Sequence, residues 1–226
     1  MAVKLVVFDI AGTTVRDDGS VATAFRNAFV KNGFEISLED THPYMGVKKV
    51  VAVQMMLDQL GARYTADDIQ RIHADFVNEM IDYYEYDPSV KPFADTEEVF
   101  QSLKEKGVRI ALNTGFPRII AETIVNRFQW MERGLIDDLI ASDEVNDGRP
   151  SPLMIEQLMY RAGIDDPMMV AKVGDTTVDI EEGRAAGCFY IISVTTGSGT
   201  MEELAPYSPT HIVNNLTEVF EVLSKN

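Results

Sequence analysis

The sequence predicts an α/β protein in which a Rossmann-like, doubly wound parallel sheet carries an inserted all-helical unit. Short apolar runs alternate with stretches whose apolar residues recur at helical spacing, which is typical of a parallel sheet with helices on both faces. Between residues 20 and 86 this alternation stops, and helical patterns follow one another without a strand-like run. We therefore expect a core domain of residues 1–16 and 91–226 and a helical cap domain of residues 17–90.

Five apolar runs are the expected strands of the core, and helical patterns lie between them. The patterns at 96–107 and 152–163 end on glycine, a common residue at the carboxyl end of a helix. In sheets of this kind the functional site lies at the carboxyl ends of the strands, near the point where the strand order reverses. The expected strands are residues 4–9, 108–113, 135–142, 168–175 and 189–196.

Three helices are expected in the cap, at residues 20–33, 44–61 and 65–86. The flanking segments RDDGS and DPSVKPFAD are rich in turn-forming residues, so we expect hinges at residues 16–20 and 86–95. A cap on two hinges can open to admit a substrate and close to exclude water.

The composition is typical of a soluble globular protein. Of the 226 residues 46% are hydrophobic and 25% are charged, and the net charge is −16. This balance disfavours nucleic acid and anionic membranes as partners, because no basic stripe is present to neutralise phosphates. Cys188 is the only cysteine, which excludes an intramolecular disulfide. The first residues are too short an apolar run for a signal peptide, and no run approaches about 20 apolar residues. We therefore expect a cytoplasmic protein.

Polar residues gather where the expected strands end, so the fold should bring them together. Asp9 ends the first strand, and Arg149 precedes a helix that two prolines help to start. Asp175 and Asp179 follow the fourth strand in VGDTTVDIEEG. The motif ALNTGF ends the second strand and supplies Asn113, Thr114 and Gly115.

This arrangement predicts three carboxylates, a hydroxyl and a guanidinium around one crevice. Clustered carboxylates repel one another unless a cation lies between them, and oxygen ligands suit Mg²⁺. A Mg²⁺ ion, an arginine, a threonine hydroxyl and backbone amides would together bind a phosphoryl or phosphonyl group. One carboxylate can then act as the nucleophile and form an aspartyl-phosphate.

The motifs DIAGT, NTG, GRPSP and GDTTVD, in this order, resemble the four motifs of the haloacid dehalogenase superfamily. The helical insertion resembles the cap of that superfamily. Three features resemble its phosphonoacetaldehyde hydrolase (phosphonatase) branch: Ala11 in place of a second aspartate, Arg149 in place of a lysine, and an M-G-x-x-K pattern in the cap. That pattern is formed by Met45, Gly46 and Lys49.

The resemblance implies a role for each matching residue. The implied catalytic residues are Asp9 as nucleophile, Lys49 as the Schiff-base lysine, Thr114 and Arg149. The implied substrate-binding residues are Ala11, Gly12, Thr13, Met45, Asn113 and Gly115. The implied Mg²⁺ ligands are Asp9, Ala11, Asp175 and Asp179.

The missing acid at Ala11 agrees with a carbon leaving group. Cleavage of a P–O ester expels an alkoxide, which a nearby acid helps by protonation. Cleavage of a P–C bond expels a carbanion, which needs an electron sink such as an iminium between a lysine and an adjacent aldehyde. The lysine must be partly neutral to attack, so its pKa should be lowered by burial or by cations such as Lys48, Arg149 or the metal.

Three positions depart from the phosphonatase pattern and leave alternatives open. Ala52 stands where that branch has a histidine, Phe116 where it has a tyrosine, and Arg16 where it has an aspartate. The expected substrate is thus phosphonoacetaldehyde or a related phosphonate. A phosphatase of small phosphate monoesters and a catalytically weak metabolite-binding protein are the alternatives. Related enzymes form dimers through the cap, so a homodimer of this kind is a further expectation.

Overall fold

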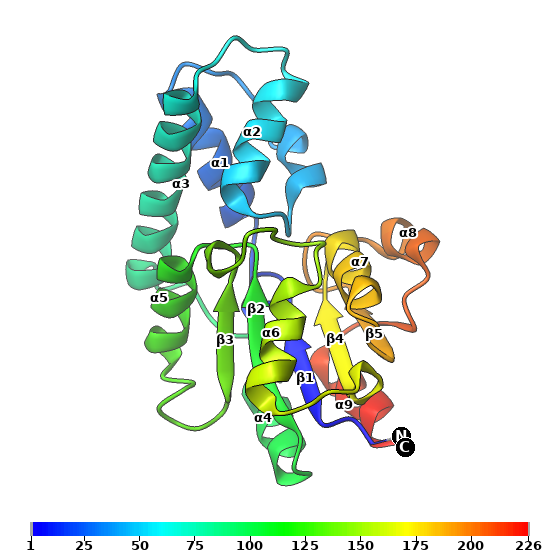
Figure 1. Ribbon diagram of the computed structural model, residues 1–226. Helices are drawn as coiled ribbons and strands as arrows, with labels where there is room; N and C mark the ends of the chain where they lie inside the picture. The colour runs from blue at the N-terminus through cyan, green and yellow to red at the C-terminus, as the bar shows by residue number, and fades with distance from the viewer. Residues whose placement is uncertain (1, 226) are drawn as a thin grey trace.

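The computed structural model describes residues 2–225 as a parallel α/β core with a helical cap over one end of its sheet (Figure 1). Within these residues the sheet has six strands in the order β3-β2-β1-β4-β5-β6, and each neighbouring pair is parallel. The strand order reverses beside β1, so the ends of β1, β2 and β4 face the cap. The strands are β1 (Leu5–Phe8), β2 (Arg109–Thr114), β3 (Asp138–Ala141), β4 (Val170–Gly174), β5 (Tyr190–Val194) and β6 (His211–Val213).

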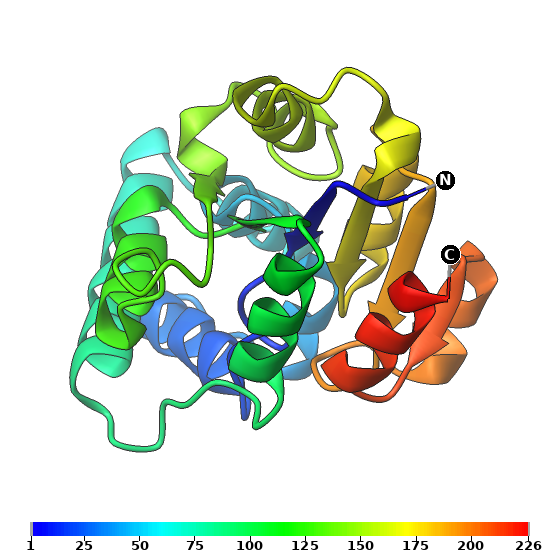
Figure 2. The ribbon, with the colours of Figure 1, turned by 90° about the horizontal axis from the view of Figure 1, so that it is seen from below.

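Helices cover both faces of the sheet, as Figure 2 shows from below. Val6 and Phe8 of β1 pack toward one face, with α4 (Thr96–Glu105), α5 (Arg118–Phe128) and α9 (Leu216–Ser224). Leu5 and Val7 pack toward the other, with α6 (Leu153–Ala162), α7 (Thr177–Ala185) and α8 (Met201–Leu204). Because β1 is buried on both faces, it reads as a continuous apolar run and not as an alternating one.

Three helices build the cap: α1 (Ser20–Lys31), α2 (Lys49–Gln59) and α3 (Ala66–Tyr86). Phe25 of α1 and Phe76 of α3 stack with their ring centroids 4.3 Å apart. The long helix α3 continues down to the core, where it runs beside α5 (Figure 1). No strand interrupts residues 20–86, in agreement with the helical insertion that the sequence predicts.

The two connections between cap and core lie side by side, in the segments expected to be hinges. Val15 forms an antiparallel bridge with Pro92, and the backbone N–H of Arg16 donates to the carbonyl oxygen of Lys91 at 3.0 Å. The backbone N–H of Phe93 also donates to the carbonyl oxygen of Thr14 at 3.2 Å, so the two connections run together between cap and core.

Several expected boundaries differ in the structure. The second cap helix begins at Lys49 and not at residue 44, because Gly46 adopts a left-handed φ of +80° that ends any helical path before it. Strand β6 was not expected; it is three residues long at the sheet edge, too short for a clear pattern. Among residues 2–225 no helix has the length and apolarity needed to cross a membrane. The short 3₁₀ helices are η1 (Glu39–Tyr44), η2 (Ser142–Glu144), η3 (Pro167–Met169) and η4 (Ala205–Tyr207).

Candidate active site

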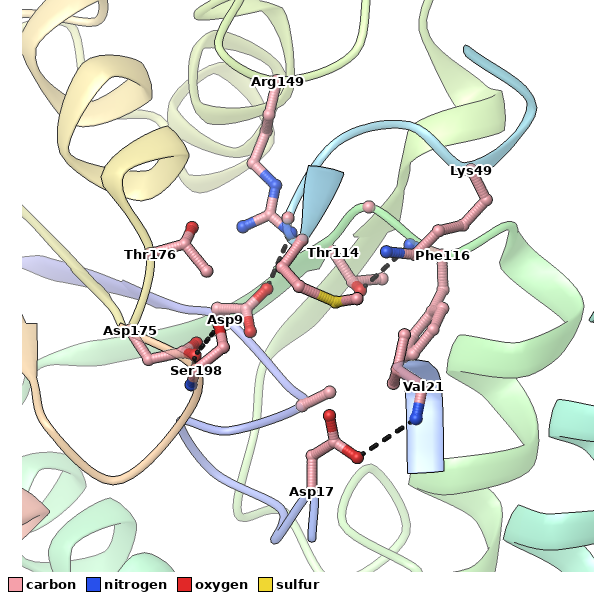
Figure 3. Close-up of a pocket in the computed structure, with 14 residues that line it drawn as sticks. Asp9, Asp17, Val21, Lys49, Thr114, Phe116, Arg149, Asp175, Thr176 and Ser198 are labelled. Carbon is pink, nitrogen blue, oxygen red and sulfur yellow. Dashed lines mark hydrogen bonds and ion pairs between the residues drawn. The ribbon is translucent and has the colours of Figure 1, made fainter. Parts of the chain in front are cut away.

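A small pocket lies between the cap and the carboxyl ends of β1, β2 and β4 (Figure 3). Its free volume is about 30 Å³, so the cap almost closes it. The residues that line it are Asp9, Ala11, Asp17, Val21, Met45, Gly46, Lys49, Thr114, Gly115, Phe116, Arg149, Asp175, Thr176 and Ser198. Most of the predicted site residues are therefore gathered here. Gly12, Thr13, Asn113 and Asp179 do not line the pocket.

Asp9 and Arg149 form a buried ion pair at the floor of the pocket. Asp9 follows β1 directly, and its backbone N–H donates to the carbonyl oxygen of Val173 at 2.9 Å, which holds it beside β4. The Arg149 guanidinium donates from Nη2 to Asp9 Oδ1 at 2.7 Å. Burial raises the pKa of Asp9, although the charge of Arg149 opposes this rise. The arginine thus anchors one carboxylate oxygen of the predicted nucleophile.

Asp179 lies behind the pocket and has protein partners at both oxygens. Its Oδ1 pairs with Arg149 and with Lys172 Nζ, the latter at 2.9 Å. Its Oδ2 accepts from the backbone N–H of Thr176 at 3.1 Å and from the Thr176 hydroxyl at 2.6 Å, which caps α7. Burial alone would raise the pKa of Asp179, but Lys172 and Arg149 lower it to about 2. Asp179, expected to bind Mg²⁺, contacts Arg149, Lys172 and Thr176 in the structure, so it positions Arg149, and its role as a metal ligand stays a prediction.

Asp175 faces Asp9 across the pocket and is held by hydroxyl and amide groups. Its Oδ1 accepts from the Thr13 hydroxyl at 3.0 Å, and its Oδ2 from the backbone N–H of Ser198 at 2.8 Å. Burial, with the nearby charges of Asp9 and Asp179, raises the pKa of Asp175 to about 7. Thr13, expected to bind substrate, is thus a support for Asp175.

Gly12 packs so closely against Asp175 that no side chain fits there. A Cβ at Gly12 would be 2.7 Å from Asp175 Oδ2, and its φ of +87° disfavours any other residue. Gly12, expected to bind substrate, therefore lets the backbone pass close to the Asp175 carboxylate.

The donor atoms around Asp9 and Asp175 suit a hard cation. Two buried carboxylates face one pocket, and burial raises the pKa of both, to which the negative charge of Asp179 adds. Ala11 lines the same pocket and can offer only backbone atoms. Within residues 2–225 no three acidic, histidine or cysteine side chains converge as a complete metal centre. These residues therefore fit an ion that takes two carboxylate ligands from the protein. Its other ligands would be a backbone oxygen, water or substrate.

Asn113 and Thr114 end β2, but their side chains point in different directions. Thr114 lines the pocket, and its hydroxyl accepts from the backbone N–H of Phe116 at 3.1 Å. Asn113 donates to Glu182 at 2.7 Å and accepts from Lys172 at 2.6 Å. Successive residues of a strand point to opposite faces, so only one of the two can face the pocket. The side chain of Asn113 is thus engaged by Glu182 and Lys172 outside the pocket, and a substrate contact at Asn113 stays a prediction.

Gly115 permits the cap to rest on the core. A Cβ at this position would lie 2.5 Å from the carbonyl oxygen of Gly46 and 2.7 Å from that of Val47, both in the cap. The backbone N–H of Lys49 also donates to the carbonyl oxygen of Gly115 at 3.3 Å. The loop before α2 is therefore seated directly on the end of β2, and it brings Lys49 to the pocket.

Lys49 is buried between aromatic rings at the cap side of the pocket (Figure 3). Only 4% of its surface is exposed, and its Nζ lies 5.3 Å from the ring centroid of Phe25 and 5.2 Å from that of Phe116. Burial, and next the charge of Arg149, lower the pKa of Lys49 to about 8. At pH 7 about a tenth of this amine is therefore unprotonated, and nucleophilic attack requires the unprotonated form.

Lys48 makes a different contribution from the one the sequence suggested. Its Nζ donates to the carbonyl oxygens of Val145 and Asn146, at 3.0 and 3.3 Å, and so ties the cap to the core. The cations that lower the pKa of Lys49 include Arg149 but not Lys48. Lys48 is thus a docking residue of the closed cap.

Some pocket residues carried no sequence motif. Asp17 lies in a segment interpreted only as a hinge, and Ser198 in the loop after β5. Ser198 could have been predicted from the sequence, because its loop also follows the carboxyl end of a strand. Phe25 could not have been predicted, since its contact with Lys49 depends on how α1 packs within the cap.

Comparisons with known proteins agree with this architecture. The haloacid dehalogenase-like hydrolase family matches residues 3–187. A phosphonoacetaldehyde hydrolase of Bacillus cereus is 32% identical over 213 residues, covering 89% of this chain and 79% of that protein. One of Bacillus anthracis is 31% identical over 213 residues, with the same coverage.

Solved structures show the same fold at lower sequence identity. A phosphonoacetaldehyde hydrolase-like protein of Oleispira antarctica has a TM-score of 0.83 at 21% identity, covering 100% of this chain and 95% of that one. A hydrolase of Pseudomonas syringae has a TM-score of 0.87 at 14% identity, covering 98% of each chain. With the four ordered motifs and the pocket at the strand ends, these matches lead to one assignment. The chain belongs to the haloacid dehalogenase-like hydrolases, and within that family it resembles the phosphonoacetaldehyde hydrolase branch.

Proposed function

We propose that this hydrolase cleaves the P–C bond of phosphonoacetaldehyde or a closely related phosphonate. The observation that carries the proposal is the position of Lys49, a buried amine with a pKa of about 8 that lines the same pocket as Asp9. Hydrolysis of a phosphate ester does not require a nucleophilic amine, whereas an aldehyde beside a phosphonyl group can condense with one. The relatives named phosphonoacetaldehyde hydrolase support the same substrate class.

Lys49 provides the electron sink in this mechanism. Its neutral amine attacks the aldehyde carbon to give a carbinolamine. The carbinolamine hydroxyl takes up a proton and leaves as water, and the nitrogen lone pair forms the C=N bond of an iminium cation. When the P–C bond breaks, its electron pair moves to the carbon chain and the iminium becomes an enamine. The rings of Phe25 and Phe116 exclude water around the amine, which keeps part of it unprotonated.

The core residues act on the phosphonyl group. Asp9 attacks phosphorus and forms an aspartyl-phosphate, which water later hydrolyses. Arg149 orients Asp9 and brings positive charge to the floor of the pocket, while Thr114 offers a hydroxyl at its wall. Asp9 and Asp175, with a backbone oxygen of Ala11, would hold Mg²⁺, which supplies positive charge for the phosphonyl oxygens.

Borohydride reduction tests the proposal. With phosphonoacetaldehyde present, reduction should add a covalent mass to Lys49 that peptide mapping locates, and the mass should be absent in Lys49→Ala. Lys48→Ala, which alters the neighbouring lysine, is the matched control and should still be labelled. Turnover of phosphate monoesters that is indifferent to Lys49→Ala, without labelling of Lys49, would overturn the proposal in favour of a phosphatase.

A further inference from the structure

Asp17 is a carboxylate of the pocket that the phosphoryl-binding residues leave unused. Asp9 is paired with Arg149, and Asp175 is held by Thr13 and Ser198. Asp17 lines the same pocket from the opposite side, at the connection between core and cap (Figure 3). It contacts none of these groups by a hydrogen bond within residues 2–225. The pocket therefore contains one acidic side chain with no assigned task.

The local structure fixes one oxygen of Asp17 and leaves the other free. Oδ1 accepts from the backbone N–H of Ser20 at 2.8 Å, from the Ser20 hydroxyl at 2.5 Å and from the backbone N–H of Val21 at 3.2 Å. Asp17 lies two residues before Gly19, the N-cap of α1, and these bonds satisfy backbone N–H groups of the first turn and hold the carboxylate in one orientation. Within the part of the chain that the structure describes, Oδ2 has no hydrogen-bond partner. In Figure 3 this second oxygen points away from α1 and into the pocket.

Schiff-base chemistry needs a proton carrier at the Lys49 end of the pocket. Three positions of the sequence do not provide one: Ala11 and Ala52 carry methyl groups, and Phe116 has no hydroxyl. The negative charge of Asp17 is felt by Lys49, whose pKa it raises. Both side chains therefore share one electrostatic environment.

We propose that Asp17 is a catalytic residue that transfers protons during formation and hydrolysis of the Lys49 imine. This inference rests on the proposed function, since it concerns the same Schiff base. Asp17 belongs to the cap-side connection and not to any of the four core motifs.

The proton transfers balance without an outside reagent. The Asp17 carboxylate takes a proton from the Lys49 ammonium, and the neutral amine adds to the aldehyde carbon to give a carbinolamine. The Asp17 acid returns its proton to the carbinolamine hydroxyl, the C–O bond breaks, and water leaves with the bonding pair. The nitrogen lone pair forms the C=N bond of the iminium, and Asp17 is a carboxylate again. After P–C cleavage the enamine carbon takes up a proton from solvent, which restores an iminium. The Asp17 carboxylate then removes a proton from the water that attacks the iminium carbon, and returns it to the nitrogen as the C–N bond breaks to release the aldehyde and the Lys49 ammonium.

The test measures imine formation separately from P–C cleavage. Acetaldehyde is used as the probe with cyanoborohydride, and the rate of ethyl labelling at Lys49 is followed by peptide mass. Asp17→Asn keeps an oxygen that can cap α1 but cannot carry the proton. We expect its labelling rate to fall by about 100-fold, a common size for loss of an acid–base group. Asp18→Asn alters the exposed neighbour, which pairs with Arg16, and should label at the wild-type rate.

The direction in which Asp17→Asn changes the labelling rate distinguishes a residue that transfers protons from one that only shifts the pKa of Lys49. Because Asp17 raises the pKa of Lys49, its removal alone should leave more neutral amine and speed up labelling. Slower labelling supports the proposal, whereas equal or faster labelling of a folded Asp17→Asn overturns it and leaves the proposed function intact. If wild-type Lys49 is not labelled, both fail. Asp17→Ser, which also caps helices, replaces Asp17→Asn if that variant does not fold.

Discussion

Replacement of Lys49 by methionine should stabilise the protein while it removes the reactive amine. Burial of the ammonium lowers its pKa from 10.5 to about 8. At about 1.4 kcal/mol per pH unit, this corresponds to a cost of about 3 kcal/mol of folding free energy at neutral pH. Methionine has a similar length and carries no charge, so Lys49→Met relieves that cost.

The predicted gain depends on pH with a definite sign. Between about pH 8 and pH 10.5 the native lysine is neutral while the unfolded one is protonated, so the unfolded state binds more protons. The stability contributed by Lys49 therefore rises with pH across this window. The advantage of Lys49→Met should be about 3 kcal/mol at pH 7 and less than about 1 kcal/mol at pH 10.

Urea unfolding of the wild type and Lys49→Met at both pH values measures this difference. Lys48→Met is the matched control, because the Lys48 ammonium is half-exposed and donates to two carbonyl oxygens. It should be less stable than the wild type and not more stable. A Lys49→Met protein that is destabilised at pH 7, or whose gain is the same at pH 10, would refute the reasoning.

Three further predictions follow from the site. The labelling rate of Lys49 should rise about tenfold per pH unit below about pH 8 and then level off, because only the neutral amine reacts; a flat profile would contradict this pKa. Lys172→Met should lower the free energy of unfolding by about 3–5 kcal/mol, since it leaves the buried carboxylate of Glu182 without a cationic partner, and adding Glu182→Met should recover part of the loss in urea unfolding. Gly115→Ala should raise KM and increase hydrogen exchange at Lys49, because its Cβ would meet Gly46; unchanged exchange would rule out cap displacement.

Local sequence patterns were sufficient for the strands β1 to β5 of the core, but not for the short edge strand β6. The continuous apolar run at residues 5–8 predicts a strand buried on both faces, and β1 has this environment. Because parallel strands all direct their carboxyl ends to one edge, the residues after β1, β2 and β4 had to meet there. Asp9, Thr114 and Asp175 could therefore be placed in one pocket before any tertiary contact was known.

The directions of the side chains at the strand ends could not be predicted from the sequence. Asn113 and Thr114 are adjacent in the NTG motif, yet one turns to Lys172 and the other to the pocket. Asp179 is one helical turn from Asp175, but the buried amine of Lys172 attracts its carboxylate away from the pocket. Such choices depend on partners that are distant in sequence, and burial makes each unpaired charge costly.

The chain by itself determined the sheet, the helical insertion and the set of core residues at the strand ends, since periodicity and strand direction are local properties. The sequence also shows that Ala11 occupies the position of a second acid. Only the tertiary structure shows which side chains lie near Ala11. Docking of the cap through Gly115 buries Lys49 between Phe25 and Phe116, and the connection between the domains brings Asp17 to the pocket. These contacts join segments that no local pattern relates, because they arise from packing of two separate units.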